Sequence, residues 1–132
     1  MNYKGFKELE CYKQARLLRM YISNLVKKFP GSEKYFLVAQ MVDCSRSVTR
    51  NIAEGYGRYT FTDTRNFFII ARGSTTETME QLSTAFDEQY ITQEELNTAE
   101  QQCELTFKLI NGYIGYLEKS RKGTMLPSSP NS

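Results

Sequence analysis

Apolar residues recur at intervals of three and four along most of the chain, in four blocks separated by short polar breaks. This spacing places the apolar side chains of each block on one face of an α-helix. The pattern predicts four helices, over about residues 6–28, 33–55, 63–89 and 93–121. Long helices with short connections pack best side by side with alternating directions. We therefore predict an all-α fold, an antiparallel up-down-up-down four-helix bundle.

Turn-forming and capping residues indicate where the helices end. Pro30 and Gly31 interrupt the first helical pattern, and Ser32 is a natural N-cap for the second helix. Thr92–Glu95 has the sequence of a capping box, in which the threonine hydroxyl and the glutamate carboxylate each accept a hydrogen bond from a terminal backbone amide. We expect the fourth helix to begin there.

The corner between the second and third predicted helices is rich in glycine and in capping residues. Gly55 and Gly57 flank a tyrosine, and glycine adopts the left-handed conformation that ends many helices without a steric cost. Thr60, Thr62 and Asp63 then offer side-chain oxygens that can cap the third helix. We predict a helix stop at the glycines and a new helix soon after them.

Aromatic and small residues on either side of this corner suggest two further features. Tyr56, Tyr59 and Phe61 could stack on unpaired bases. Aromatic residues in a tight interhelical loop more often cover the core, and we favour that interpretation. Gly73–Thr76 is an unusual helix centre, because glycine costs about 1 kcal/mol relative to alanine there. Such a run of small residues predicts that another element packs very close.

The length of the chain favours one domain. With 132 residues, 40% of them hydrophobic, it can form one core and is too short to expect two. We assign residues 1–122 to the bundle and residues 123–132, with two prolines and three serines, to a disordered tail. Cys11, Cys44 and Cys103 are widely spaced and the chain has no histidine, so we expect reduced core or boundary cysteines.

The residue inventory favours no catalytic, cofactor or membrane role. The usual dimetal site of a four-helix bundle needs two Glu-x-x-His pairs, and the chain has no histidine. Glu54, Glu77 and Glu104 could meet as an all-oxygen site, but the surrounding polarity gives no sign of one. No glycine loop for phosphate and no stretch near the ~20 apolar residues of a membrane span is present. We predict a non-catalytic cytoplasmic protein without metal or cofactor.

Charge is distributed unevenly, although the formal net charge is only +2. Residues 1–72 hold 13 Lys or Arg against 6 Asp or Glu, whereas residues 73–118 hold 1 against 9. In the expected topology, the start of the first helix, the second corner and the end of the fourth helix share one end of the bundle. We therefore predict a basic pole there and an acidic pole, with Asp87, Glu88, Glu94 and Glu95, at the other end.

The basic pole is the candidate binding surface. Five arginines fall within 27 residues around the second corner, and further basic residues end the fourth helix. The predicted nucleic-acid-binding residues are Arg46, Arg50, Arg58, Arg65, Arg72, Lys119, Arg121 and Lys122. Such a surface would bind phosphate backbones with weak sequence preference. The alternative is a solvated charged end with internal ion pairs, such as Arg50 with Glu54 four residues later.

Several short segments together resemble a known family. They are Phe6–Leu9, Lys28–Pro30, Ser47–Val48 followed by Asn51–Arg58, and Ile70–Ser74 with Glu77. They resemble the 23S ribosomal RNA intervening-sequence proteins over about residues 3–118. The structural motif residues are Asn51, Glu54, Gly55, Gly57, Gly73, Ser74 and Glu77, of which we expect the first two to hydrogen-bond backbone amides or neighbouring helices at the corner.

The resemblance implies an antiparallel four-helix bundle that assembles into a ring-shaped homopentamer, with no established enzyme activity. A relative of the same fold is the accessory variability protein of diversity-generating retroelements, a basic pentamer that binds nucleic acid and works with a reverse transcriptase. We therefore expect an oligomeric accessory or scaffold protein that binds RNA or DNA, with a reverse transcriptase as candidate partner. The alternative is a structural or protein-interaction bundle, encoded in a 23S rRNA intervening sequence, without a nucleic-acid role.

The amount of apolar surface also favours an oligomer. One four-helix core cannot absorb every large apolar residue of the chain, and exposed apolar patches usually mark interfaces. The residues expected in excess of the core are Tyr3, Phe6, Tyr35, Phe68, Ile69, Tyr113 and Tyr116.

Overall fold

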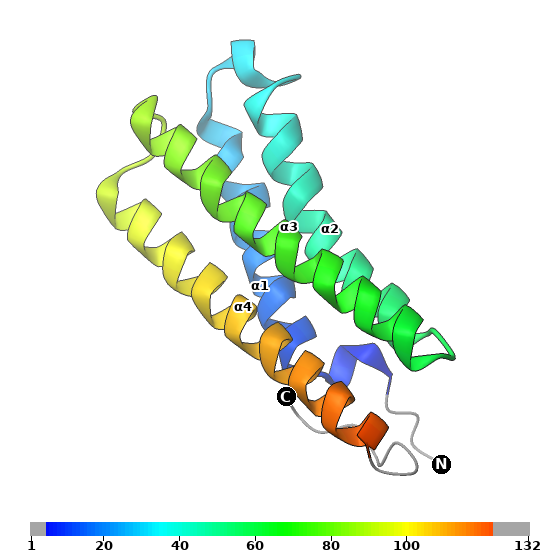
Figure 1. Ribbon diagram of the computed structural model, residues 1–132. Helices are drawn as coiled ribbons and strands as arrows, with labels where there is room; N and C mark the ends of the chain where they lie inside the picture. Colours follow the sequence, from blue (N-terminus) through cyan, green and yellow to red (C-terminus); the bar gives the residue numbers. More distant parts are fainter. Residues whose placement is uncertain (1–4, 123–132) are drawn as a thin grey trace.

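The fold is a bundle of four long α-helices (Figure 1). The computed structural model describes residues 5–122. Its α-helices are α1 (Glu10–Leu25), α2 (Leu37–Tyr56), α3 (Phe61–Asp87) and α4 (Gln93–Lys122), and its 3₁₀ turns are η1 (Phe6–Glu8), η2 (Val26–Lys28) and η3 (Gly31–Glu33). No strand occurs within residues 5–122, so the predicted all-α bundle is confirmed. The predicted tail, residues 123–132, lies outside the described residues.

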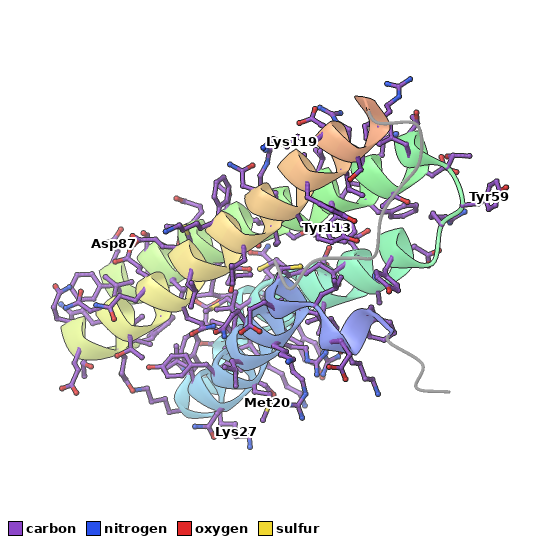
Figure 2. All side chains as sticks on the ribbon, turned by 90° about the horizontal axis from the view of Figure 1, so that it is seen from below. Met20, Lys27, Tyr59, Asp87, Tyr113 and Lys119 are labelled. Carbon is purple, nitrogen blue, oxygen red and sulfur yellow. The ribbon has the colours of Figure 1, made fainter. Side chains whose placement is uncertain are left out.

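The helices pack in chain order around a common core. Each helix packs against the next, and α1 also packs against α4, which closes an antiparallel bundle. The start of α1, the α2–α3 connection and the end of α4 lie together at one end, which we call the corner end (Figure 1). Figure 2 shows Tyr59 beyond this end and Asp87 near the opposite one. This topology is the one that the sequence predicted.

The predicted apolar faces point inward and form two clusters. One cluster, around Leu18, Met41 and Leu82, lies away from the corner end, and the other, around Ile52 and Phe68, lies near it. Between the two clusters along α3 and α4 are three fully buried threonines, Thr75, Thr78 and Thr106. Their hydroxyls donate to carbonyls four residues earlier at 2.9, 2.9 and 2.8 Å, respectively. These bonds remove the penalty of about 1–3 kcal/mol for a buried unpaired hydroxyl.

The start of α1 differs from the prediction. The first α-helix begins at Glu10 rather than near residue 6, because Leu9 is extended (φ −68°, ψ 133°). This bend folds η1 back so that the Phe6 ring contacts the Tyr12 ring edge-on, with centroids 4.9 Å apart. Tertiary packing therefore overrides the helical pattern of residues 6–9.

The start of α2 is also later than predicted, and Ser32 is not its N-cap. Residues 31–33 form η3, and α2 begins at Leu37, whose N–H donates to the carboxylate of Glu33 at 3.3 Å. The hydroxyl of Tyr90, on the α3–α4 connection, donates to the other oxygen of Glu33 at 2.8 Å. The Glu33 carboxylate therefore caps α2 in place of Ser32, because Tyr90, which is distant in sequence, holds that carboxylate in position.

The two glycines of the corner do not end α2 by a left-handed turn. The helix continues through Gly55 to Tyr56, and Gly57 keeps a right-handed conformation (φ −82°, ψ −4°). Gly55 is buried, and a Cβ there would lie 2.9 Å from both Phe67 Cβ and Phe68 Cδ1. Its role is therefore to let α2 approach α3. Of the three capping residues that the sequence offered, Thr60 caps α3, accepting the N–H of Asp63 at 3.2 Å.

The predicted capping box at the start of α4 is confirmed. The N–H of Glu95 donates to the Thr92 hydroxyl at 3.1 Å, and the N–H of Thr92 donates to the Glu95 carboxylate at 2.9 Å. The same carboxylate accepts a hydrogen bond from the Lys28 ammonium group, which links the α1–α2 connection to the start of α4. The hydrogen bond from Lys28 is the main cause of the lowered pKa of Glu95.

Candidate nucleic-acid interface

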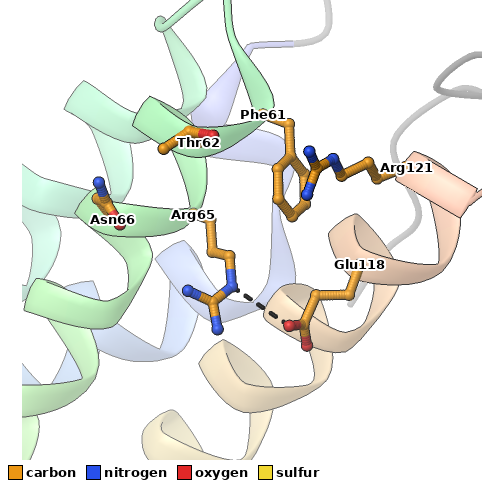
Figure 3. A pocket seen from close by; sticks show the side chains of 6 residues that line it. All are labelled: Phe61, Thr62, Arg65, Asn66, Glu118 and Arg121. Atoms are coloured by element: carbon orange, nitrogen blue, oxygen red, sulfur yellow. Dashed lines mark hydrogen bonds and ion pairs between the residues drawn. The ribbon is translucent and has the colours of Figure 1, made fainter.

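The structure divides the predicted basic cluster between two opposite faces of the bundle. Arg46 and Arg50 line a groove between α1 and α2. Arg65 and Arg121 line a pocket between α3 and α4 (Figure 3). In a closed bundle in which α1 packs against α2 and α4, these two helix pairs form opposite sides. The sequence placed all four residues on one pole without separating its two faces.

On the α3–α4 face and at the corner, the arginines are engaged with other side chains. Arg65 Nε lies 3.2 Å from Glu118 Oε2, and the Arg121 guanidinium lies over the Phe61 ring at 4.8 Å (Figure 3). Other arginines follow the same pattern: Arg72 donates to Asn111 at 2.6 Å, and Arg58 pairs with Glu54 at 3.0 Å and lies over the Phe67 ring. The expected Arg50–Glu54 pair is therefore replaced by Arg58–Glu54.

The α1–α2 groove is lined by basic and aromatic residues and has a volume of ≈ 340 Å³. Its lining residues are Phe6, Tyr12, Arg19, Arg46, Thr49, Arg50 and Ala53. Within the described residues, no carboxylate lies within 4.0 Å of the guanidinium of Arg46 or Arg50. These two charges stay exposed and are not neutralised by a neighbouring acid.

Arg19 is held in the groove by a neutral partner. Its Nη1 donates to the Thr49 hydroxyl at 3.1 Å, and that hydroxyl in turn donates to the backbone carbonyl of Arg46 at 3.1 Å. A hydroxyl orients the guanidinium without cancelling its charge. Arg19 therefore adds a fixed positive charge beside Arg46 and Arg50.

A second hollow adjoins the groove and extends its positive charge. It has a volume of ≈ 540 Å³ and shares Tyr12 and Arg19 with the groove. Its other lining residues are Lys7, Lys13, Arg16 and Leu17. Sequence reasoning missed Lys13, Arg16 and Arg19 as part of the interface. Their spacing of three along the first helix is the signal that could have found them, because such residues lie near one another on a helix surface.

Two further basic residues from the prediction lie at the corner end. Lys119, on the last turns of α4, is exposed (Figure 2). Lys122 is the last residue of α4, and its side chain lies outside the description. At the opposite end the predicted acidic pole is partly compensated, since Glu95 pairs with Lys28.

The aromatic residues of the corner differ in their positions. Tyr56 and Phe61 are partly buried and pack against the core cluster near the corner end, as favoured. Tyr59 is 100% exposed and projects from the α2–α3 connection, so for this residue the core-covering interpretation is wrong (Figure 2). Tyr59 lies in the short connection between α2 and α3, outside both helices.

Three of the predicted motif residues, Asn51, Gly55 and Ser74, lie at the seam between α2 and α3. The hydroxyls of Ser47 and Ser74 are 2.7 Å apart, and the amide of Asn51 donates to the Ser47 carbonyl and hydroxyl at 2.8 and 2.9 Å. Asn51 thus hydrogen-bonds the backbone of its own helix at Ser47, whereas Glu54, for which the same role was expected, pairs with Arg58 instead. The close packing expected for Gly73–Thr76 holds at Ser74, which contacts Ser47 of α2, and is wrong at Gly73, where a Cβ would meet no atom within 4 Å.

The acidic and sulfur-containing residues of the described part of the chain form no metal site. Glu54, Glu77 and Glu104 are exposed, and residues 5–122 contain no group of three or more His, Cys, Asp or Glu able to hold a metal ion. Cys11, Cys44 and Cys103 form no disulfide bond with one another and are buried, as predicted. Burial raises the pKa of Cys103 to about 12, so its thiol stays protonated at neutral pH. Among the described helices, none is long and apolar enough to cross a membrane.

Part of the apolar surface expected in excess lies in the core. Phe68 and Tyr113 are buried, with their rings stacked at 4.6 Å between α3 and α4, so the expectation is wrong for both. Tyr35 is 78% exposed, and Phe36 beside it is also exposed. Tyr3 lies outside the described residues.

Comparisons with known proteins agree with this fold. The model of the 23S rRNA-intervening sequence protein family matches residues 7–112. A crystal structure of a protein of unknown function from the S23 ribosomal protein family of Bacteroides thetaiotaomicron has the same fold, with a TM-score of 0.74 and 23% identity over 80% of this chain and 95% of that chain. The comparison with curated proteins finds no match. Because the family match spans most of the chain, the protein belongs to the 23S rRNA-intervening sequence protein family.

Proposed function

We propose that this protein is a non-catalytic nucleic-acid-binding protein that holds RNA or DNA backbones in the α1–α2 groove. The observation that carries the proposal is the contrast between the two basic faces. Arg46 and Arg50 have no described acid within ion-pair distance, and Arg19 is oriented by a neutral hydroxyl. On the opposite face, Arg65 and Arg121 are engaged by a carboxylate and an aromatic ring.

The chemistry of arginine supports the choice of phosphate as ligand. A guanidinium group donates up to five hydrogen bonds in a planar fork that matches the oxygens of a phosphate. Binding a phosphate releases condensed counterions, and this release supplies most of the affinity of sequence-independent binding. A groove with three arginines therefore favours a nucleic-acid backbone over an uncharged partner.

Oligomerisation and an accessory role complete the proposal. In a ring-shaped homopentamer, as the resemblance implies, each copy would present one α1–α2 groove. Several grooves on one particle would raise the overall affinity for a long strand well above that of one groove. We propose a reverse transcriptase as the protein partner. This part of the proposal rests on the resemblance to the accessory variability protein.

A salt titration of binding tests the groove directly. Affinity for mixed-sequence RNA and DNA is measured between about 50 and 200 mM salt for the unmodified protein and for the Arg46→Gln, Arg50→Gln variant. The slope is that of the logarithm of the binding constant against the logarithm of the salt concentration. Each lost phosphate contact should reduce the magnitude of this slope by about 0.7–0.9. We expect the double variant to lose about 1.4–1.8 from the slope, in addition to affinity.

The matched control removes the same charge from the opposite face. The Arg65→Gln, Arg121→Gln variant has the same net charge as the groove variant, so any difference between them reports position rather than total charge. We expect its salt slope to stay close to that of the unmodified protein. Both variants must keep the oligomeric state of the unmodified protein in light scattering. Equal slopes for all three proteins, or no binding by the unmodified protein at low salt, would refute the groove as the binding site.

A further inference from the structure

The α1–α2 groove combines its positive charge with aromatic rings, which backbone binding alone does not need. Phe6 lines the groove and is only partly buried, so part of its ring is open to the groove. Its edge-on contact with Tyr12, at 4.9 Å between centroids, fixes the orientation of the ring. Aromatic rings beside basic side chains are the usual means by which proteins bind unpaired bases.

The groove is the size of a small-ligand site. Its volume of ≈ 340 Å³ lies near the lower end of the range of about 300–1,000 Å³ found for small-ligand sites. The adjoining hollow shares Tyr12 and Arg19 and is lined by Lys7, Lys13 and Arg16. The two hollows therefore form one track in which the charged residues continue past the aromatic pair. A strand with one base stacked against Phe6 can extend its next phosphates along this track.

We propose that the α1–α2 groove selects unpaired nucleic-acid strands, with one base against Phe6 and the adjacent phosphate at Arg46 and Arg50. The inference rests on the proposed function and adds the kind of strand that is bound. A duplex keeps its bases stacked in its interior and can offer only phosphates to the groove. The aromatic ring contributes to binding only when a base is free to reach it.

The test compares nucleic acids that differ in whether unpaired bases are available. Fluorescence anisotropy measures binding of a mixed-sequence single strand, the matching duplex, and an abasic strand with the same number of phosphates. We expect the single strand to bind at least about five-fold more tightly than the abasic strand, because base–aromatic stacking contributes this much or more. The salt slope should be similar for the single strand and the abasic strand, since both carry the same phosphates.

Variants of Phe6 assign the effect to the ring. Phe6→Leu keeps an apolar side chain at the edge of the core but removes the ring, and Phe6→Tyr keeps the ring. We expect Phe6→Leu to weaken single-strand binding about five-fold or more without changing binding of the abasic strand, and Phe6→Tyr to bind like the unmodified protein. Phe61→Leu is the matched control, because Phe61 also lies beside an arginine, on the opposite face.

The outcomes separate this inference from the proposed function. If abasic strand, duplex and single strand bind equally while Arg46→Gln, Arg50→Gln still lowers the salt slope, the groove binds backbones but does not select unpaired bases. If the arginine variant binds like the unmodified protein, both the groove and the inference are overturned. The comparison of abasic and normal strands needs no variant, so it decides whether unpaired bases contribute to binding even if Phe6→Leu fails to fold, and equal binding of the two strands overturns the inference.

Discussion

Gly55→Ala adds a methyl group where α2 packs against α3. The new Cβ would lie 2.9 Å from Phe67 Cβ, 2.9 Å from Phe68 Cδ1 and 3.0 Å from Phe68 Cε1. Phe67 Cβ is fixed to the backbone of α3, and the Phe68 side chain is fully buried against Tyr113. Neither atom can move away by a simple rotation of an exposed side chain. The two helices must therefore separate or rotate to admit the methyl group.

Two opposing contributions decide the size of the effect. Alanine in place of glycine within a helix stabilises the folded state by about 1 kcal/mol. Overpacking of a well-packed core costs about 1–3 kcal/mol, because neighbours leave their preferred positions. Gly73→Ala isolates the first contribution, since a Cβ at Gly73 meets no atom within 4 Å. We expect Gly55→Ala to be less stable than Gly73→Ala by about 1–3 kcal/mol, which is the packing cost alone.

Urea denaturation followed by far-UV circular dichroism measures this difference. All proteins are compared at one protein concentration, because association of copies would make the apparent stability depend on concentration. The slope of unfolding free energy against urea should stay the same, so that the midpoint reports stability. Gly112→Ala is a second control, with open space around its Cβ position. If Gly55→Ala gains as much stability as the two controls, the close-packing role of Gly55 is wrong.

Two further predictions concern Cys103 and Glu95. Because burial raises the pKa of Cys103 to about 12, on the order of one thiol in 10,000 is ionised at about pH 8; a thiol reagent should react with it only after unfolding, and rapid labelling of the native protein would contradict its burial. The hydrogen bond from Lys28 lowers the pKa of Glu95 below its ordinary 4.5. The stabilisation is therefore complete above pH 4.5 and is lost as pH falls through the lowered value, so the unmodified protein and Glu95→Gln should converge in unfolding free energy in acid. A difference that stays constant with pH would count against this pair.

Local patterns in the chain were enough to predict the four helices and the caps of α3 and α4. The spacing of Leu18, Met41 and Leu82 predicted which helix faces are buried, because a helix repeats every 3.6 residues regardless of its partners. The Thr92–Glu95 capping box was predictable for the same reason, since both of its hydrogen bonds join residues three apart. Sequence reasoning failed where a distant residue decides, as at Glu33, which Tyr90 holds over the start of α2.

The candidate site depended much more on tertiary structure. From the sequence alone, Arg46, Arg50 and Arg65 were neighbours around one corner, and Arg19 was not part of the site. Packing places Arg65 on the face opposite Arg46 and brings Arg19 within 3.1 Å of Thr49. The sequence by itself determined four amphipathic helices and an excess of positive charge in the first 72 residues. Only the tertiary structure decided which charges share a surface, because the rotation of one helix against the next is set by how all four buried faces fit together.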